Sequence, residues 1–207
     1  MLTKRLRDRA TLLASAVVVA SALSACGSSS STAADPAATD PSSPPTSPAS
    51  APHADPVKPA DGPMLSAQGF SFHAPKGWAD VTDRAETGVL LSAAQPTDEQ
   101  PLVINVRRVV PGAQTTAGAR ARATVLLKTA GATHVRTRPD TTVAGFPTVH
   151  LVGRQDLHGA HYELDVYYVR ASKAGWPLTF ATNQYTTQER RSAMLDSVLQ
   201  TCRFHSA

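Results

Sequence analysis

The segment His161-Tyr-Glu-Leu-Asp-Val-Tyr-Tyr168 decides the fold, because its residues alternate in character with a period of two. Successive side chains of a β-strand point to opposite faces of a sheet. We therefore interpret this segment as the clearest strand in the chain. One face carries Tyr162, Leu164, Val166 and Tyr168, and the other carries Glu163, Asp165 and Tyr167.

Further strands are expected on both sides of this segment. Thr148–Val152 lies before it, and residues 153–159 between the two contain Gly153 and Gly159, a composition that suits a hairpin loop. The run Leu178–Phe180 continues the meander. Shorter strands are expected earlier in the chain, at residues 70–73, 89–91, 102–106 and 141–143.

Two segments have helical spacing instead. In Thr116–Ala130 the apolar residues recur every three or four positions, and Gly131 follows as a stop signal. Later, Thr186-Thr187-Gln188-Glu189 is a capping box that opens a second helix. The expected buried stripes are Ala119, Ala123, Leu126, Leu127 and Ala130 in the first helix, and Met194, Leu195, Val198 and Leu199 in the second.

The order of these elements predicts the fold class. This order is typical of α+β architecture, with a central antiparallel sheet flanked by helices. It runs from several strands through a helix, a run of antiparallel strands and a second helix to a last short strand. The 144 residues of 64–207 can bury a core without disulfides. Cys202 shares strand parity with Phe204, so we expect a buried, unreactive thiol.

The amino terminus predicts export. Residues 4–9 are mostly basic, and the 14 residues Ala10–Leu23 are apolar and uncharged, as in a secretory signal peptide over residues 1–25. That run is shorter than the ~20 residues that cross a bilayer as a helix. The sequence Leu23-Ser24-Ala25-Cys26 resembles the lipobox of bacterial lipoproteins, in which the cysteine is lipidated and becomes the first mature residue. The alternative is an ordinary cleaved signal with Cys26 as a bystander.

Residues 26–63 are expected to be a lipidated cysteine followed by a disordered tether. Between Gly27 and Pro59 the chain has eight proline, eight serine and seven alanine residues, and Val57 is the only large apolar one. Such a segment cannot bury enough apolar surface to offset its ordering entropy. The last predicted segment, 64–207, is the folded domain.

The net charge argues against a nucleic-acid partner. The chain carries +4, but the signal peptide contributes +3 and the tether −3, while residues 64–207 carry 15 basic and 11 acidic side chains. The basic character is largely a property of the export signal. Within the domain, the arginines that could form a basic patch do not converge, so we expect them on solvated faces: Arg107, Arg108, Arg120, Arg122, Arg136 and Arg138.

Three motifs carry a resemblance to a known family. They are an opening Phe70-x-Phe72-x-x-Pro75-x-Gly77-Trp78, the turn Val143-Ala-Gly-Phe-Pro147, and a final helix that runs into Leu195–Phe204. In this order they resemble the PsbP-like family over residues 65–205. Together with the lipobox and tether, the chain resembles LpqN-type lipoproteins of actinobacteria. The resemblance implies a central antiparallel sheet flanked by helices, an accessory or binding role, and no shared catalytic residues.

Two groups of residues are candidates for a site. Asp156, His158 and His161 could supply three metal ligands, although a solvated hairpin loop is the simpler interpretation. Tyr167 and Trp176 could line a ligand groove, although aromatic residues on neighbouring strands more often form the core. We expect no cofactor and no resident metal.

The sequence therefore predicts a lipid-anchored protein on the extracytoplasmic face of a membrane, which acts as a non-catalytic binding or accessory module in the cell envelope. Its partner would be an envelope protein or a lipid or glycan ligand. Hydrolase, zinc-protease and nucleotide-binding motifs are absent from the sequence, which disfavours an enzyme. The alternative is a secreted enzyme of unrecognised type, hydrolytic or metal-dependent, because scattered residues can also form an active site.

Overall fold

The computed structural model describes residues 56–97, 101–157, 159–171 and 173–205. The signal peptide, the lipobox with Cys26, and most of the tether lie outside these residues. The described part begins at Pro56, within the predicted tether, and its first residues contact the domain. The Ala60 amide donates to the carbonyl of Ser197 at 2.9 Å, and the Gln200 side chain donates to the carbonyl of Val57 at 3.1 Å.

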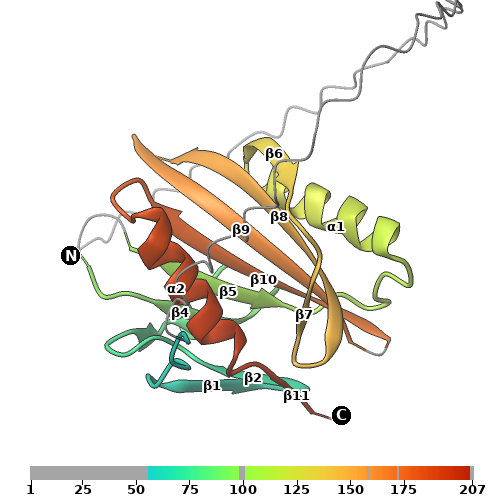
Figure 1. Cartoon of the computed structure of the whole chain (residues 1–207), viewed down its shortest axis with the longest axis horizontal. Coiled ribbons are helices and arrows are strands. Elements are labelled where there is room, and N and C mark those ends of the chain that lie inside the picture. Colours follow the sequence, from blue (N-terminus) through green and yellow to red (C-terminus); the bar gives the residue numbers. More distant parts are fainter. Residues whose placement is uncertain (1–55, 98–100, 158, 172, 206–207) are drawn as a thin grey trace, which may run out of the picture. The chain divides into compact units, whose positions relative to one another are not determined.

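A large antiparallel sheet forms the centre of the domain, in the order β3-β4-β5-β10-β9-β8-β6, with β7 paired to β8 (Figure 1). Its strands in the described residues are β3 (Ala79–Asp80), β4 (Val89–Ala94), β5 (Val103–Arg107), β6 (Thr133–Thr137), β7 (Thr141–Val143), β8 (Phe146–Leu157), β9 (Ala160–Ala171) and β10 (Ala174–Asn183). A smaller sheet joins β1 (Met64–Ala67), β2 (Phe70–His73) and β11 (Arg203–Phe204). A short 3₁₀ helix, η1, spans Thr82–Arg84.

The hairpin of β8 and β9 differs from its prediction. The strands pair as far as Leu157 and Ala160, so the predicted loop at 153–159 is wrong and only a tight turn with Gly159 remains. Gly153 lies inside β8 because its missing side chain admits a neighbour. A Cβ at Gly153 would meet the Cβ of Ala132 at 2.9 Å. This glycine is a close-packing residue and not a turn residue.

Helix α1 (Thr116–Thr129) forms where the sequence predicted it and packs on one face of the central sheet. The Thr115 side chain accepts from the Gly118 amide at its start, and Gly131 has a φ of 78° just after its end. Its buried residues contact apolar side chains of β8 and β9 that share this face. Of the predicted stripe, Ala119, Ala123 and Leu127 are buried, Leu126 is half-buried, and Ala130 is exposed.

Helix α2 (Gln188–Leu199) covers the opposite face (Figure 1). Its N-cap is Thr187, whose side chain accepts from the Arg190 amide at 3.3 Å. The predicted capping box does not form, because the Thr186 amide donates to the Asn183 carbonyl at 3.1 Å and is not left for Glu189. Leu195 and Val198 are buried, while Met194 and Leu199 are only partly buried.

Both faces of the sheet are therefore buried at β9, where the alternation in 161–168 suggested one apolar and one charged face. Asp165 and Tyr167 point toward α2 and are 1% and 6% exposed. Tyr162, expected on the apolar face, is only partly buried. The predicted α+β class, a central antiparallel sheet flanked by helices, is confirmed.

Cys202 lies at the end of this core and is fully buried, as expected. Burial raises the pKa of its thiol to about 12, and the nearby Arg203 only partly offsets this rise. Among the described residues, no helix is long and apolar enough to cross a bilayer.

Candidate functional site

The predicted metal-ligand candidates lie at the exposed tip of the β8–β9 hairpin. His161 and Asp156 form a hydrogen bond through Nδ1 and Oδ1, and their side chains are 65% and 75% exposed. His158 lies outside the described residues. Elsewhere in the described chain, no three His, Cys, Asp or Glu side chains are grouped so as to hold a metal ion.

The two aromatic groove candidates are not brought together. Tyr167 lies on β9 beneath α2, and its ring packs edge-on against Phe180 at 5.8 Å. Trp176 lies on β10 and stacks on Phe70 at 5.6 Å, with Arg108 over its ring at 5.8 Å. Each is almost fully buried, so both are core residues, and each touches a different cavity.

Several of the arginines are engaged in separate ion pairs. Arg120 binds Asp140 at 2.7 Å, and Arg136 binds Glu163 at 3.2 Å. Arg107 binds Glu86 and the carbonyl of Thr87. These pairs lie on different elements, so they do not form one basic surface.

A groove opens where α1 leaves the sheet uncovered. The helix packs on β6, β8 and β9, while the same face of β5 and β10 remains open beside it. The resulting groove has a volume of about 740 Å³. Its floor and walls are mainly apolar: Val103, Leu126, Leu157, Tyr162, Leu164, Val166 and Ala181.

Polar groups lie among and around these apolar side chains. Arg107 and Glu86 form their ion pair among the lining residues, and Gln155 donates to the carbonyl of Ala130 at the end of α1. The Asn105 side-chain oxygen accepts from the Ser92 hydroxyl at 2.7 Å. The groove can therefore enclose an apolar chain and offer charged groups to a polar end.

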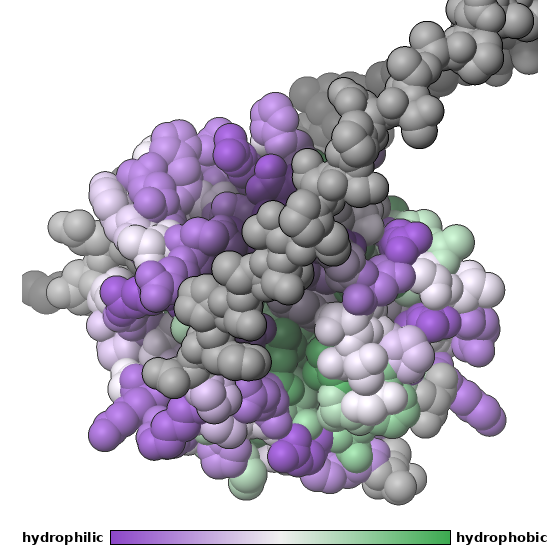
Figure 2. All heavy atoms as spheres, viewed as in Figure 1, coloured by the Kyte–Doolittle hydropathy of each residue, from purple (hydrophilic) through white to green (hydrophobic). Residues whose placement is uncertain are grey.

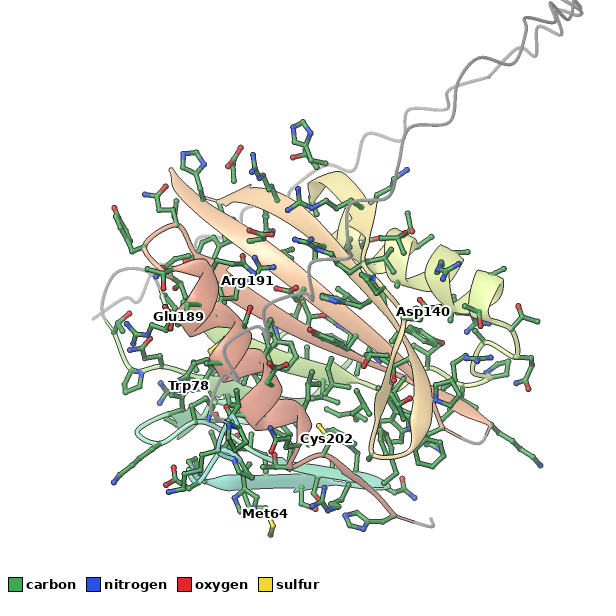
Figure 3. All side chains as sticks on the ribbon, viewed as in Figure 1. Met64, Trp78, Asp140, Glu189, Arg191 and Cys202 are labelled. Carbon is green, nitrogen blue, oxygen red and sulfur yellow. The ribbon has the colours of Figure 1, made fainter. Side chains whose placement is uncertain are left out.

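On the opposite face, α2 covers a network of buried charges that the sequence analysis missed. Arg191 is 4% exposed and donates through Nε to Asp165 at 2.7 Å (Figure 3). Its Nη1 lies 2.8 Å from Glu163. Asp165 also binds Nε2 of His150 at 2.7 Å. Because a carboxylate only accepts, Nε2 carries the hydrogen of this bond.

One signal in the sequence could have revealed this network. Arg191 has helical spacing with Leu195 and Val198, the two buried apolar residues of α2. A charged residue in an apolar stripe must find a buried partner of opposite charge. Asp165 is that partner, because it alternates onto the sheet face that α2 covers.

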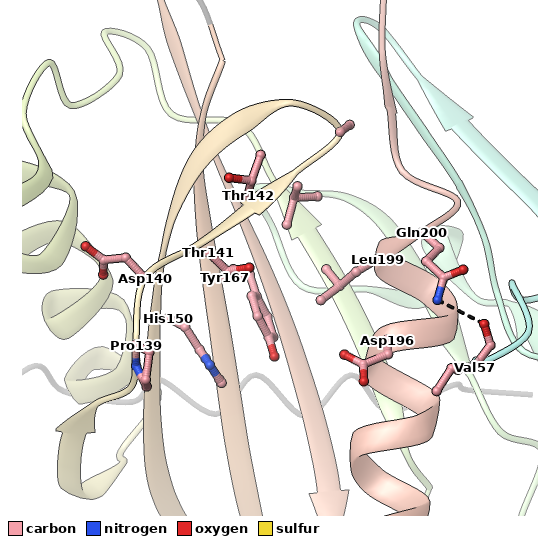
Figure 4. A pocket seen from close by; sticks show the side chains of 12 residues that line it. Val57, Pro139, Asp140, Thr141, Thr142, His150, Tyr167, Asp196, Leu199 and Gln200 are labelled. Carbon is pink, nitrogen blue, oxygen red and sulfur yellow. Dashed lines mark hydrogen bonds between the residues drawn. The ribbon is translucent and has the colours of Figure 1, made fainter. Parts of the chain in front are cut away.

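Beside this network lies a second cavity, of about 730 Å³, between α2 and the β7–β8 hairpin (Figure 4). His150 stacks on Tyr167 at its base, with ring centroids 4.1 Å apart. Apolar residues are visible between α2 and this hairpin, with hydrophilic residues around them (Figure 2). The lining includes Val57, Thr141, Val143, Asp196 and Leu199.

The electrostatics of this second cavity are dominated by burial and negative charge. The pKa of Tyr167 is raised above its ordinary value, mainly by burial and further by Asp165 and Asp196. The phenol therefore stays protonated and can donate. Within the described residues, no serine, threonine or cysteine side chain forms a hydrogen bond with His150.

The central antiparallel sheet and its two flanking helices form an α+β domain with a Mog1-like fold. No family model and no curated protein matches the chain. Among solved structures, it is similar to the Ran-binding protein Mog1p of Saccharomyces cerevisiae, with 11% identity and a TM-score of 0.53 over 70% of this chain and 96% of that one. At this identity the likeness shows the fold alone.

Weaker similarities accompany it. LpqN of Mycobacterium tuberculosis, a protein involved in cell envelope biogenesis, has 12% identity and a TM-score of 0.46 over 70% of this chain and 90% of that one. The cyanobacterial PsbP of Synechocystis has 15% identity and a TM-score of 0.47 over 69% and 92%. A protein of Bacteroides thetaiotaomicron has 11% identity and a TM-score of 0.47, with 70% of this chain covered, and the chain spans 49% of its length.

Proposed function

We propose that the chain is a lipid-anchored envelope protein whose domain binds an amphiphilic ligand, with the acyl chain of that ligand in the groove beside α1. The lipobox Leu23-Ser24-Ala25-Cys26 supports the anchor, and the proline- and serine-rich tether would hold the domain away from the membrane. In this proposal the protein faces the extracytoplasmic side and acts by binding and not by catalysis.

The groove is the observation that carries this proposal. Its volume of about 740 Å³ lies within the range of small-molecule sites, ~300–1,000 Å³. Each methylene removed from water contributes about 0.8 kcal/mol. A chain of ten carbons would thus gain roughly 8 kcal/mol from burial, before the costs of association are subtracted.

A titration with a fluorescent fatty acid, dansyl-undecanoic acid, tests the groove. The full-length chain with Cys26→Ala is used, so that no attached acyl chain competes. We expect saturable binding, and at least tenfold weaker binding in Leu126→Asp, because Leu126 lines the groove. The matched control is Val125→Asp, since Val125 is the adjacent residue of α1 but is 61% exposed.

Equal affinities in the two variants, or no saturable binding by the parent chain, would contradict the groove assignment. Thermal unfolding of both variants shows whether a loss of binding arises from loss of the fold. A protein partner recovered by crosslinking on intact cells, with no bound lipid, would favour a protein ligand over an amphiphile.

Fractionation tests the anchor separately from the groove. We expect the parent chain in the membrane fraction and the Cys26→Ala chain in the soluble fraction, because two acyl chains hold a protein on a bilayer far better than none. Retention of the Cys26→Ala chain on the membrane would show that the lipobox assignment is wrong.

A further inference from the structure

We propose that the cavity between α2 and the β7–β8 hairpin is a second binding site, and that it takes a ligand with a protonated amine next to a hydroxyl group. The site is separate from the groove beside α1. His150 and Tyr167 alternate onto the sheet face that α2 covers, whereas Leu164 and Val166 line the groove on the other face.

The first observation is a hydroxyl without a partner that faces the cavity. The Tyr167 residue is only 6% exposed, and its hydroxyl forms no hydrogen bond within the described residues. The hydroxyl is not one of the buried unpaired atoms of these residues, so it is accessible from the cavity. Figure 4 shows its phenol end between His150 on β8 and Asp196 on α2. A tyrosine hydroxyl that is unpaired in the chain and accessible from a cavity is available to a ligand.

The second observation is the orientation of His150. Its Nε2 donates to Asp165, which fixes the ring and its tautomer. Stacking on Tyr167, with the ring planes 14° apart, holds the ring in place. Its Nδ1 makes no bond to the described part of the chain and, in the neutral ring, is a hydrogen-bond acceptor. A ligand hydroxyl can accept from Tyr167 and donate to this nitrogen.

The third observation is the charge of the lining. Asp140 and Asp196 line the cavity, and no lysine or arginine among the described residues does. Asp140 is bound to Arg120 at 2.7 Å, whereas Asp196 has no ion pair among the described residues. Asp196 also lies in the last turn of α2, where the helix dipole is negative. This end of the cavity therefore favours a cation.

Nearby positive charges do not cancel this preference. Arg191 lies behind the cavity and is held by Asp165 and Glu163. Arg138 is close enough to act on the pKa of Tyr167 but does not line the cavity. The apolar wall of Val57, Val143 and Leu199 can cover the carbon skeleton of the ligand. An amino sugar and an ethanolamine group both present this combination of amine and neighbouring oxygen.

The test is an NMR chemical-shift titration of the full-length Cys26→Ala chain with glucosamine, ethanolamine, N-acetylglucosamine and glucose. We expect saturable binding of glucosamine or ethanolamine, and at least fivefold weaker binding of the two uncharged sugars. A preference for glucosamine identifies a glycan source of the amine, and a preference for ethanolamine identifies a headgroup source.

Two variants assign the binding to this cavity. Tyr167→Phe removes only the hydroxyl and Asp196→Asn removes only the charge, and we expect each to weaken amine binding at least fivefold. The matched controls are Tyr185→Phe and Asp83→Asn, at exposed positions outside the cavity. If Tyr167→Phe fails to fold, Asp196→Asn still tests whether the amine binds in this cavity, because Asp196 is exposed.

Three results would overturn the proposal. They are equal binding of glucosamine and N-acetylglucosamine, unchanged amine binding in Asp196→Asn, and an absence of saturable binding by either amine. None of them affects the fatty-acid titration, because that probe binds on the other face of the sheet.

Discussion

At the scale of single residues, the salt bridge between Asp165 and Arg191 is the most deeply buried ion pair among the described residues. Both side chains are buried, at 1% and 4% exposure, and Arg191 also binds Glu163. Surface pairs such as Arg136 with Glu163 contribute ~0–1 kcal/mol, because solvent screens them. A buried charge that loses its partner is far more costly.

We expect Arg191→Leu to lower the free energy of unfolding by about 3–5 kcal/mol, because it leaves Asp165 buried with only His150 as a side-chain partner. Urea denaturation measures this change. The control is Arg190→Leu at the adjacent exposed position, where we expect a change within ~0.5 kcal/mol. Similar stabilities for the two variants would show that the buried pair contributes little.

Cys202 gives a prediction for pH. The ordinary pKa of its thiol is 9.0, and burial raises it to about 12 in the folded chain. Above pH 9 the unfolded chain loses this proton while the folded chain keeps it, so the unfolded state is stabilised relative to the folded state. The stabilising contribution is complete below pH 9 and is lost as the pH rises toward 12.

The free energy of unfolding should therefore fall above pH 9 by up to about 1.4 kcal/mol per pH unit from this group. In Cys202→Ala that part of the slope should disappear, and urea denaturation between pH 8 and 11 measures the difference. Identical slopes in parent and variant would contradict a raised thiol pKa. Alkylation by iodoacetamide at pH 8 should also be slow until the chain is unfolded.

At the scale of elements, the sequence located the helices well and the ends of elements poorly. Helix α1 was predictable because its cap, its spacing and Gly131 all agree. The ends of β8 and the start of α2 were not, since both depend on partners distant in the sequence. From the sequence alone Gly153 indicates a turn, but in the structure it makes room for Ala132. Likewise Thr186 is predicted as the helix cap, but its amide donates to the Asn183 carbonyl.

The predicted start of α2, a capping box of Thr186 and Glu189, differs from the observed N-cap at Thr187, and substitutions distinguish the two. We expect Thr187→Ala to lower the free energy of unfolding by about 1 kcal/mol, because the Arg190 amide loses its acceptor. Glu189→Ala should cost less, since Glu189 makes no capping bond to the Thr186 amide. Thermal or urea unfolding measures both. A larger loss of stability in Glu189→Ala than in Thr187→Ala would show that the predicted capping box forms.

At the scale of the whole molecule, the sequence predicted the fold but not the sites. The strands alternate and the helices are amphipathic, so a sheet with flanking helices follows. The sites depend on which strands each helix covers. Helix α1 packs on β6, β8 and β9 and leaves β5 and β10 open, and α2 buries charged side chains. Tyr167 was singled out as an aromatic, yet its unpaired hydroxyl emerges only from the packing around it.

The proposal that the groove holds an acyl chain is tested most directly by photocrosslinking. A diazirine-labelled palmitate is irradiated with the full-length Cys26→Ala chain, and the labelled residues are located by mass spectrometry. We expect the label on groove residues, chiefly Leu126, Leu157 and Tyr162. Label confined to exposed apolar residues outside the groove, such as Met64, Val110 and Tyr185, or spread evenly over the surface, would contradict the proposal.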